Sequence, residues 1–215
     1  MKIEHRTVGL FEENCYLVAD EENGRAVLID PGDEGARLLA MLSESRMTLD
    51  AIWLTHAHID HIGAVAEICR HHDVPVYLHP LDLPWYTTLS ELSAETYGID
   101  FEQPDVPITE LADGDVLHCG QLQFTVMHVP GHAPGLVSFN GHGVAFAGDL
   151  LYAGSIGRTD LTLGNPSAMN LSLDRFVSTL PAETIVYPGH GPRTTLSREQ
   201  RTNPFLLALD RATRF

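Results

Sequence analysis

The sequence predicts an α/β fold in which two β-sheets pack against each other and helices cover their outer faces. Three observations lead to this prediction. Short apolar runs typical of buried strands alternate with segments of helical periodicity in both halves of the chain. Several of these runs end in loops that contain glycine together with histidine or aspartate. No internal repeat or low-complexity linker divides the 215 residues, so we expect one domain spanning residues 1–215.

The first part of the chain contains three strand-like segments separated by turns, which indicates an antiparallel meander. These segments are residues 2–9, 14–20 and 26–29. A helix is expected from Asp33 to about Arg46, because apolar residues recur there at helical spacing. The next expected elements are a strand at 51–54, a helix over 62–69 and a strand at 76–78.

Residues 80–111 differ from their surroundings because four prolines punctuate a stretch that is rich in aromatic residues. We expect a partly helical excursion from the main sheet. It is either a lid that faces the substrate or a simple cover for a sheet edge, and long connections permit both.

The remaining elements follow from the same patterns. A strand is expected at 122–129, and the strands 136–139 and 143–147 are expected to form a hairpin across Asn140-Gly141. A helix over 167–180 and a strand at 185–187 come next. A short C-terminal helix is expected at about 197–211, interrupted at Asn203-Pro204.

Composition limits the classes of partner. The 13 lysines and arginines stand against 29 aspartates and glutamates, which gives a net charge of −16. Such a surface repels phosphate, so we expect neither nucleic acid nor anionic membrane as a partner. The chain has no apolar run of bilayer length and begins without the apolar stretch of a signal peptide, so a cytoplasmic location is expected. Oligomeric state cannot be inferred from these patterns.

The segment Thr55-His56-Ala57-His58-Ile59-Asp60-His61 concentrates potential metal ligands in a few positions. His56 and His58 lie about 200° apart on a helix, so a helical face cannot present both. A loop after the strand 51–54 would place them on one side. A solvated polar loop is the alternative interpretation of this segment alone.

Three further residues weaken that alternative, because each follows a predicted strand within a glycine-containing turn. They are His132, Asp149 and His190. Together with His56, His58, Asp60 and His61 they make seven nitrogen and oxygen ligands, enough for two divalent metal ions that share a carboxylate. Asp149 is the natural bridge between the two ions. Zinc is the first expectation, and iron or manganese would suit the same ligands.

These motifs resemble those of the metallo-β-lactamase superfamily. The resemblance is carried by the segment 55–61, Pro130-Gly131-His132, Gly148-Asp149 and Pro188-Gly189-His190, with Glu13-Asn14-Cys15-Tyr16 and Asp30-Pro31-Gly32 near the start. It implies an αββα four-layer sandwich with the metals at one edge. It also implies a first metal on His56, His58 and His132, a second metal on Asp60, His61 and His190, and Asp149 between them.

Within the superfamily, Asp149 and the stretch that follows it are similar to the short bacterial hydroxyacylglutathione hydrolase (glyoxalase II) branch. The resemblance implies a thioester hydrolase acting on a small-molecule substrate such as S-lactoylglutathione, with Asp60 and Asp149 as catalytic residues. The chain departs from larger members in two respects. Their long C-terminal helical domain is reduced to about one helix, and Arg158 and Asp160 replace a Lys and a Tyr that bind glutathione.

Two questions stay open at this stage. Arg158 could bind a carboxylate of the thiol carrier, or it could form a loop salt bridge with Asp160. The main rival function is a mononuclear iron persulfide dioxygenase, which would use His56, His132 and Asp149. Lactam hydrolysis and nuclease action rank lower, the first because of Asp149 and the absent export signal, the second because of the net charge.

Overall fold

The computed structural model describes residues 1–212 and contains two six-stranded sheets. The first sheet has the order β1-β2-β3-β4-β5-β6. Its strands are β1 (Lys2–Val8), β2 (Glu13–Asp20), β3 (Arg25–Ile29), β4 (Thr48–Trp53), β5 (Val76–Leu78) and β6 (Ile108–Glu110). The pairs β1–β2 and β2–β3 are antiparallel, as the meander predicts, and the pairs from β3 to β6 are parallel.

The second sheet has the order β14-β13-β10-β9-β8-β7. Its strands are β7 (Val116–Cys119), β8 (Leu122–His128), β9 (Val137–Gly141), β10 (Val144–Gly148), β13 (Ile185–Pro188) and β14 (Thr194–Thr195). Only β10 and β13 pair in parallel; the other pairs are antiparallel. A separate two-stranded ribbon is formed by β11 (Leu151–Tyr152) and β12 (Ser155–Ile156).

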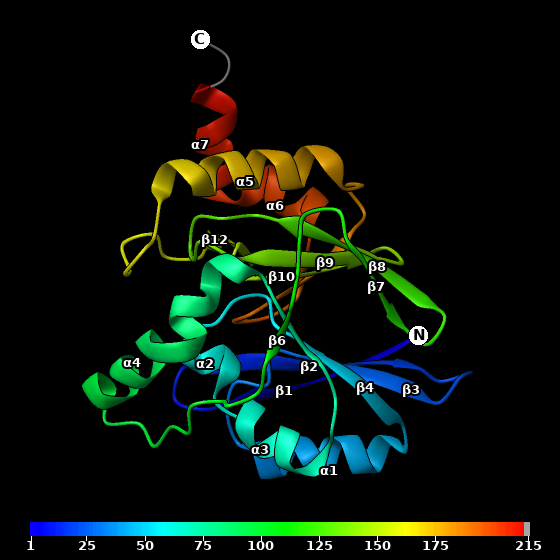
Figure 1. The fold of residues 1–215 in the computed structure, drawn as a ribbon. Helices are drawn as coiled ribbons and strands as arrows, with labels where there is room; N and C mark the ends of the chain where they lie inside the picture. The colour runs from blue at the N-terminus through cyan, green and yellow to red at the C-terminus, as the bar shows by residue number, and fades with distance from the viewer. Residues whose placement is uncertain (213–215) are drawn as a thin grey trace.

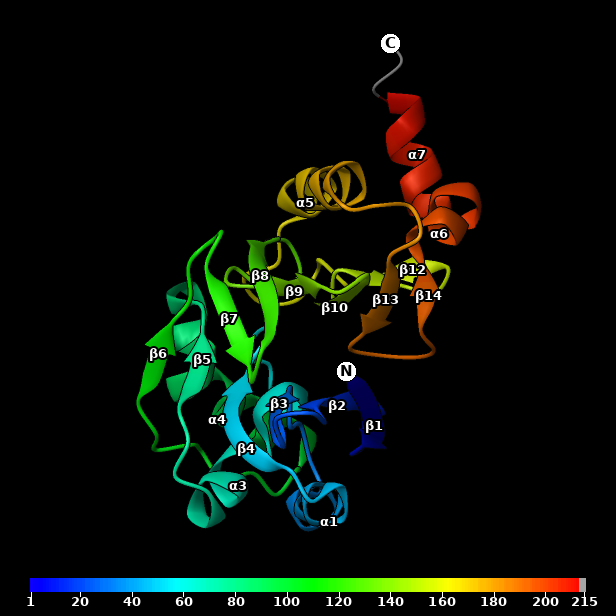
Figure 2. The same cartoon turned by 90° about the vertical axis from the view of Figure 1, so that its right-hand side faces the viewer.

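Helices cover both outer faces, which confirms the four-layer αββα sandwich. Helices α1 (Gly35–Ser45) and α3 (Val65–His71) lie against the first sheet, while α5 (Pro166–Thr179), α6 (Leu196–Thr202) and α7 (Pro204–Ala212) lie beyond the second (Figure 1). The view turned by 90° shows the same order of layers, with α1 and α3 on one side of the two sheets and α5, α6 and α7 on the other (Figure 2).

Three apolar clusters hold these layers together. Between the sheets, Trp53 of the first packs on Phe124 and Phe139 of the second, with ring centroids 5.6 and 5.3 Å apart. A second cluster lies between the first sheet and its helices, and a third, which includes Phe176 of α5, lies between the second sheet and its helices. Burial of this apolar surface is the main favourable term for the fold.

The helix predicted over 62–69 is two short helices, α2 (Ile59–Ile62) and α3, which corrects that prediction. The break lies at Gly63, where a Cβ atom would come 2.3 Å from the carbonyl oxygen of Gly32. Close approach of two backbones therefore decides the local structure here, and periodicity alone does not reveal it.

The hairpin turn was also predicted at the wrong residues. The turn between β9 and β10 is formed by His142 and Gly143, with φ of 52° and 76°, whereas Asn140 and Gly141 belong to β9. The buried Asn140 side chain donates hydrogen bonds to the carbonyl oxygens of Thr125 and Ser138. Those contacts keep Asn140 in the strand and override its turn preference.

The excursion at 80–111 is partly helical, as expected. It contains a 3-10 turn η1 (Pro80–Asp82), a π-helix η2 (Trp85–Leu89) and α4 (Ser90–Tyr97), and it returns as β6 at the edge of the first sheet. The C-terminal helix breaks at Asn203, as the Asn-Pro pair predicts. Among residues 1–212, no helix has the length and apolar character needed to cross a membrane.

Candidate metal centre

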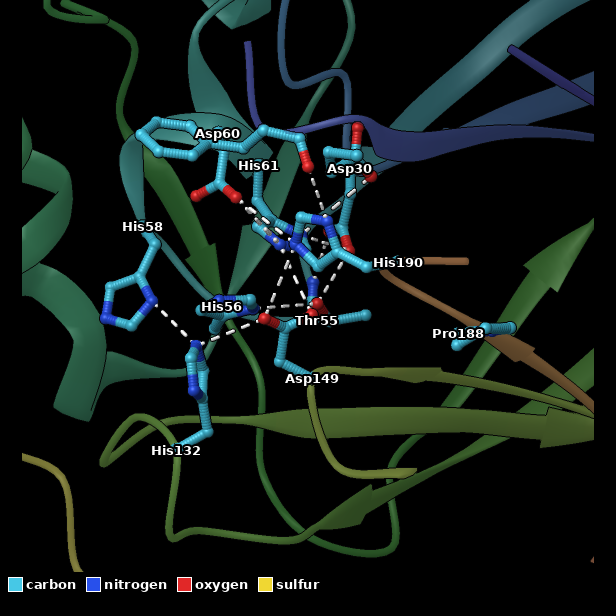
Figure 3. Close-up of polar contacts among 12 residues, drawn as sticks. Asp30, Thr55, His56, His58, Asp60, His61, His132, Asp149, Pro188 and His190 are labelled. Carbon is cyan, nitrogen blue, oxygen red and sulfur yellow. Dashed lines mark hydrogen bonds and ion pairs between the residues drawn. The ribbon is translucent and has the colours of Figure 1, made fainter. Parts of the chain in front are cut away.

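All seven predicted ligands meet at one edge of the sandwich (Figure 3). His56 and His58 lie in the loop after β4, Asp60 and His61 in α2, and the other three directly follow β8, β10 and β13 in the loops that the sequence predicted. Strands from both sheets therefore present their ends to a common point.

The first group of ligands consists of His56, His58 and His132, whose candidate ligand atoms lie within 4.8 Å of one another. The Nε2 atom of His132 is 2.8 Å from the Nδ1 atom of His58. All three side chains are buried. Burial and neighbouring histidines lower the pKa of His56 well below its usual value and that of His58 to about 3. The rings of His56 and His58 are therefore neutral, which is the state that binds metal.

The second group consists of Asp60, His61 and His190. The Oδ2 atom of Asp60 lies 3.2 Å from Nε2 of His190 and 3.9 Å from Nε2 of His61. His190 and Asp60 are partly exposed, while His61 is fully buried. This group therefore forms the side of the site nearer to solvent.

Asp149 lies between the two groups. Its Oδ2 atom is 3.3 Å from Nε2 of His132 and 3.6 Å from Nε2 of His190, and its Oδ1 atom is 3.5 Å from Nε2 of His61. Burial alone would raise the pKa of Asp149, but His132 and His61 outweigh it and hold the pKa well below the usual value. The Asp149 carboxylate is thus placed to serve both groups.

Unpartnered buried atoms test whether these residues fit metal ions. The Nε2 atoms of His56 and His61 and the Oδ1 atom of Asp149 are buried and have no hydrogen-bond partner in the protein. Buried polar atoms are almost always paired, because an unpaired one costs about 1–3 kcal/mol. Divalent cations would satisfy these lone pairs and relieve the close contact between His58 and His132. The residues fit the metals.

A second ring of contacts fixes the orientation of the histidines. The Oδ1 and Oδ2 atoms of Asp30 accept hydrogen bonds from the backbone N–H and the hydroxyl of Thr55, at 2.7 and 2.6 Å. The Thr55 hydroxyl can in turn accept from Nδ1 of His56 at 3.1 Å. Each such bond leaves Nε2 of the ring as the free ligand atom.

The other histidines are oriented by backbone carbonyls. Nδ1 of His132 donates to the carbonyl oxygen of Arg158 at 2.7 Å, and Nδ1 of His190 donates to that of Phe11 at 3.0 Å. The loop that carries Arg158 and the turn between β1 and β2 are therefore parts of the site, although they supply no predicted ligand.

Sequence reasoning missed three buried acidic residues. Asp30 was noted only within Asp30-Pro31-Gly32; its φ of 50°, unusual for a non-glycine residue, is a signal that the structure alone provides. Asp82 accepts hydrogen bonds from the backbone N–H groups of Ala57 and Gly135. Glu13 is fully buried, with its Oε1 atom 3.9 Å from Nδ1 of His61. No local motif marks Asp82.

A cavity of about 350 Å³ opens over the site. Its wall includes His58, Asp60, His132, Asp149 and His190, and several aromatic side chains surround them. Trp85, Ser93 and Tyr97 come from the segment 80–111, which therefore faces the cavity as well as covering the sheet edge through β6. Arg158 lines the cavity, but its guanidinium binds Asp160 through two hydrogen bonds of 2.9 and 3.0 Å.

The fold and the ligand groups agree with the comparison to known families, in which residues 8–190 match the model of the metallo-beta-lactamase superfamily. The chain belongs to this superfamily. The family resemblance and the fold class predicted from the sequence are thereby confirmed. The superfamily is one of metallo-hydrolases, and this chain has a cluster of histidine and aspartate residues suited to metal.

Two relatives in the superfamily are similar over nearly their full length. The probable metallo-hydrolase YqgX of Bacillus subtilis is 38% identical over 212 residues, covering 96% of this chain and 98% of the relative. The hydroxyacylglutathione hydrolase GloC of Haemophilus influenzae is 36% identical over 212 residues, with the same coverage of 96% and 98%.

Two solved structures of the superfamily are similar as well. TTHA1623, in a di-iron-bound form, is 48% identical with a TM-score of 0.87, covering 94% of this chain and 100% of that chain. The BLEG-1 B3 metallo-beta-lactamase is 36% identical with a TM-score of 0.89, covering 95% and 99%. These similar proteins include a hydroxyacylglutathione hydrolase and a metallo-beta-lactamase, so the similarity shows the superfamily and not one substrate.

Proposed function

We propose that the protein is a two-metal hydrolase of 2-hydroxyacyl thioesters, with S-lactoylglutathione as the first substrate to test. The observation that carries the proposal is the position of Asp149 between two complete ligand groups. The similarity to the hydroxyacylglutathione hydrolase of Haemophilus influenzae supports the choice of substrate class.

In this proposal the first metal is held by His56, His58 and His132, and the second by Asp60, His61 and His190. Asp149 contributes to both. Nitrogen and oxygen ligands of this kind suit zinc, iron and manganese, and zinc is the first candidate. The di-iron form of TTHA1623 supports a two-metal count but does not decide the metal of this chain.

Two bound divalent ions would lower the pKa of a shared water and polarise the thioester carbonyl. Asp149, which lies between the two ligand groups, would help to hold both ions. Asp60 lies at the cavity wall, where its carboxylate orients that water toward the carbonyl carbon. Addition of the water oxygen to that carbon and cleavage of the C–S bond yield a hydroxy acid and a thiol. The thiol leaves as its thiolate, because its pKa of about 8.5 makes a strong proton donor unnecessary.

The main alternative is a mononuclear iron persulfide dioxygenase that uses His56, His132 and Asp149. The geometry of the second group disfavours it. Asp60 and His190 lie 3.2 Å apart and both face the cavity, so a complete second ligand set is in place. The second set of candidate ligands favours the two-metal hydrolase over an enzyme with one iron.

The deciding experiment combines metal analysis with three assays on the protein as isolated. Two metals per chain and hydrolysis of S-lactoylglutathione are expected. One iron per chain, with oxygen consumption on glutathione persulfide and negligible thioester cleavage, would establish the alternative. A β-lactam is the third substrate, because the BLEG-1 lactamase is a close structural relative. The variant His118→Ala, which changes an exposed histidine on β7 outside the candidate ligand set, is purified in the same way and should keep the wild-type metal content and turnover.

A further inference from the structure

Beyond the candidate ligands, the cavity wall contains four aromatic side chains, which are Phe11, Trp85, Tyr97 and Tyr152. Phe11 and Tyr97 meet edge to face at its rim, with ring centroids 5.4 Å apart. Trp85 packs against His58 at 4.3 Å, and Tyr152 lies on the opposite side near His190, at 5.9 Å. A ligand that extends outward from the metals therefore passes between rings, which bind apolar and aromatic groups.

Positive charge is scarce at this wall. Arg158 is the only lysine or arginine among the cavity-lining side chains in the part of the chain that the structure describes. Both Nε and Nη2 of its guanidinium donate to the carboxylate of Asp160. The Nε–Nη2 edge of the guanidinium, one of the edges through which an arginine binds a carboxylate with two hydrogen bonds, is thus engaged by Asp160.

The loop geometry holds this pair in place. The carbonyl oxygen of Arg158 accepts the hydrogen bond from His132, so the backbone at this position is fixed by a metal-ligand residue. At Gly157 a Cβ atom would lie 1.9 Å from the carbonyl oxygen of Asp149, so the loop also passes directly against the bridging residue. The Arg158 side chain consequently starts from a fixed point, with Asp160 two residues away.

We propose that the site takes thioesters whose thiol carrier is uncharged and apolar, and that Asp160 sets this preference by occupying the guanidinium of Arg158. The proposal rests on the proposed thioester hydrolysis for its reaction, but the carrier preference is a property of the cavity wall. A carrier such as glutathione brings two carboxylates and one ammonium group to a protein of net charge −16. To bind through the Nε–Nη2 edge of Arg158, a carrier carboxylate has to displace Asp160, whereas an aromatic carrier contacts Phe11, Trp85 and Tyr97 directly.

The test compares two lactoyl thioesters on metal-loaded enzyme, one of glutathione and one of benzyl mercaptan. A kcat/KM at least about tenfold higher for the benzyl thioester is expected, a difference of about 1.4 kcal/mol. Binding of the matching non-hydrolysable thioethers, S-(2-hydroxypropyl)glutathione and benzyl 2-hydroxypropyl sulfide, is measured by calorimetry in parallel. The benzyl thioether should bind more tightly.

The variant Asp160→Asn tests the role of the ion pair. Both side chains of the pair are largely exposed, 67% for Arg158 and 72% for Asp160, so the substitution should not disturb folding. Exposed pairs are weak, so freeing Arg158 should raise the ratio of glutathione to benzyl kcat/KM by about threefold to fivefold. The affinity of the glutathione thioether relative to that of the benzyl thioether should rise as well. Both gains should vanish in the double variant Arg158→Gln/Asp160→Asn.

The outcomes separate the two proposals. If neither thioester is cleaved but the benzyl thioether binds more tightly, the proposed reaction fails and the carrier preference stands. If the glutathione compounds are preferred in both measurements, the carrier preference is overturned while hydrolysis stands. If Asp160→Asn leaves both ratios as in the wild type, Asp160 does not set the preference.

Discussion

The Oδ2 atom of Asp30 lies 3.0 Å from the Nδ1 atom of His61, and both side chains are buried. The same oxygen accepts the hydroxyl of Thr55 at 2.6 Å. One carboxylate therefore orients a histidine of the second ligand group directly and His56 of the first group through Thr55. Acidic groups that orient ligand histidines contribute to metal affinity without touching the metal.

Replacing Asp30 by asparagine should weaken the second metal site. The amide nitrogen would take the place either of Oδ2, facing the ring N–H of His61 and the Thr55 hydroxyl, or of Oδ1, facing the Thr55 backbone N–H, so a donor would oppose a donor. We expect metal content to fall from two toward one per chain and thioester turnover to fall about tenfold to a hundredfold. Metal analysis after dialysis measures the first effect. Asp105→Asn, at an exposed position, is the matched control. Retention of both metals with full turnover would show that Asp30 does not orient His61.

Much of the scaffold could be predicted from sequence because it depends on local patterns. Alternation and apolar runs located strands that carry ligands, and glycine-containing turns located His132, Asp149 and His190. The ring around the ligands could not be predicted in this way. Asp30 contacts Thr55 across 25 residues, and Asp82 contacts Gly135 across 53. The first contact needs β3 and β4 to pair within the first sheet, and the second needs loops of the two sheets to meet.

The errors of prediction have a similar origin. Strands β6, β7, β11, β12 and β14 were not predicted, and three of these contain only two residues each. Their pairing partners, not their own sequence, make them strands. The displaced hairpin turn likewise follows from side-chain contacts of Asn140 with β8 and β9.

Asp82 should make stability depend on pH. It bridges the loop that carries His56 and His58 to the loop that carries His132. Burial raises the pKa of Asp82 to about 6, although two backbone N–H groups partly counteract this. The folded state therefore binds the proton more tightly than the unfolded state. The resulting stabilisation is complete below the unfolded pKa of about 3.9 and is lost as pH rises through about 6.

This contribution amounts to about 3 kcal/mol for a shift of about two units. The metal-free wild type and Asp82→Asn should be compared by urea unfolding between pH 4 and 8. The variant should lose the pH-dependent part of the stability, because its amide does not titrate. Its deficit should be largest near pH 4 and smaller above pH 6. A deficit that does not change with pH would show that Asp82 does not titrate in this range.

His190 tests whether the second metal is needed for turnover. Its Nε2 atom lies 3.2 Å from Asp60, and it is the most exposed histidine of the ligand set. His190→Gln should lower the metal content toward one per chain and reduce thioester turnover at least about tenfold. The folded structure should survive, because the side chain is partly exposed; circular dichroism checks this. Intact turnover with a single bound metal would rule out a working second metal.

The buried Glu199 connects the C-terminal helices to the cavity wall, and it allows stability and function to be tested together. Its carboxylate accepts hydrogen bonds from the Gly154 N–H, the Thr194 hydroxyl and the Asn203 side chain, at 2.8, 2.5 and 3.0 Å. Asn203 also donates to the carbonyl oxygen of Ser155 at 3.0 Å. These bonds hold the β11–β12 ribbon, which carries the cavity residue Tyr152.

Glu199→Ala should leave three donors without an acceptor and a cavity in the core, which costs about 3 kcal/mol or more. Glu199→Gln is the matched variant. Its carbonyl oxygen can still accept from Gly154 and Asn203, and the Thr194 hydroxyl can turn to accept from the new amide, so the cost should be about 1 kcal/mol. Urea unfolding of the metal-loaded proteins measures both costs. KM for the thioester should rise in the alanine variant, because Tyr152 loses its support, whereas metal content should stay at the wild-type value. Equal stability of the two variants would show that the three hydrogen bonds do not hold the ribbon.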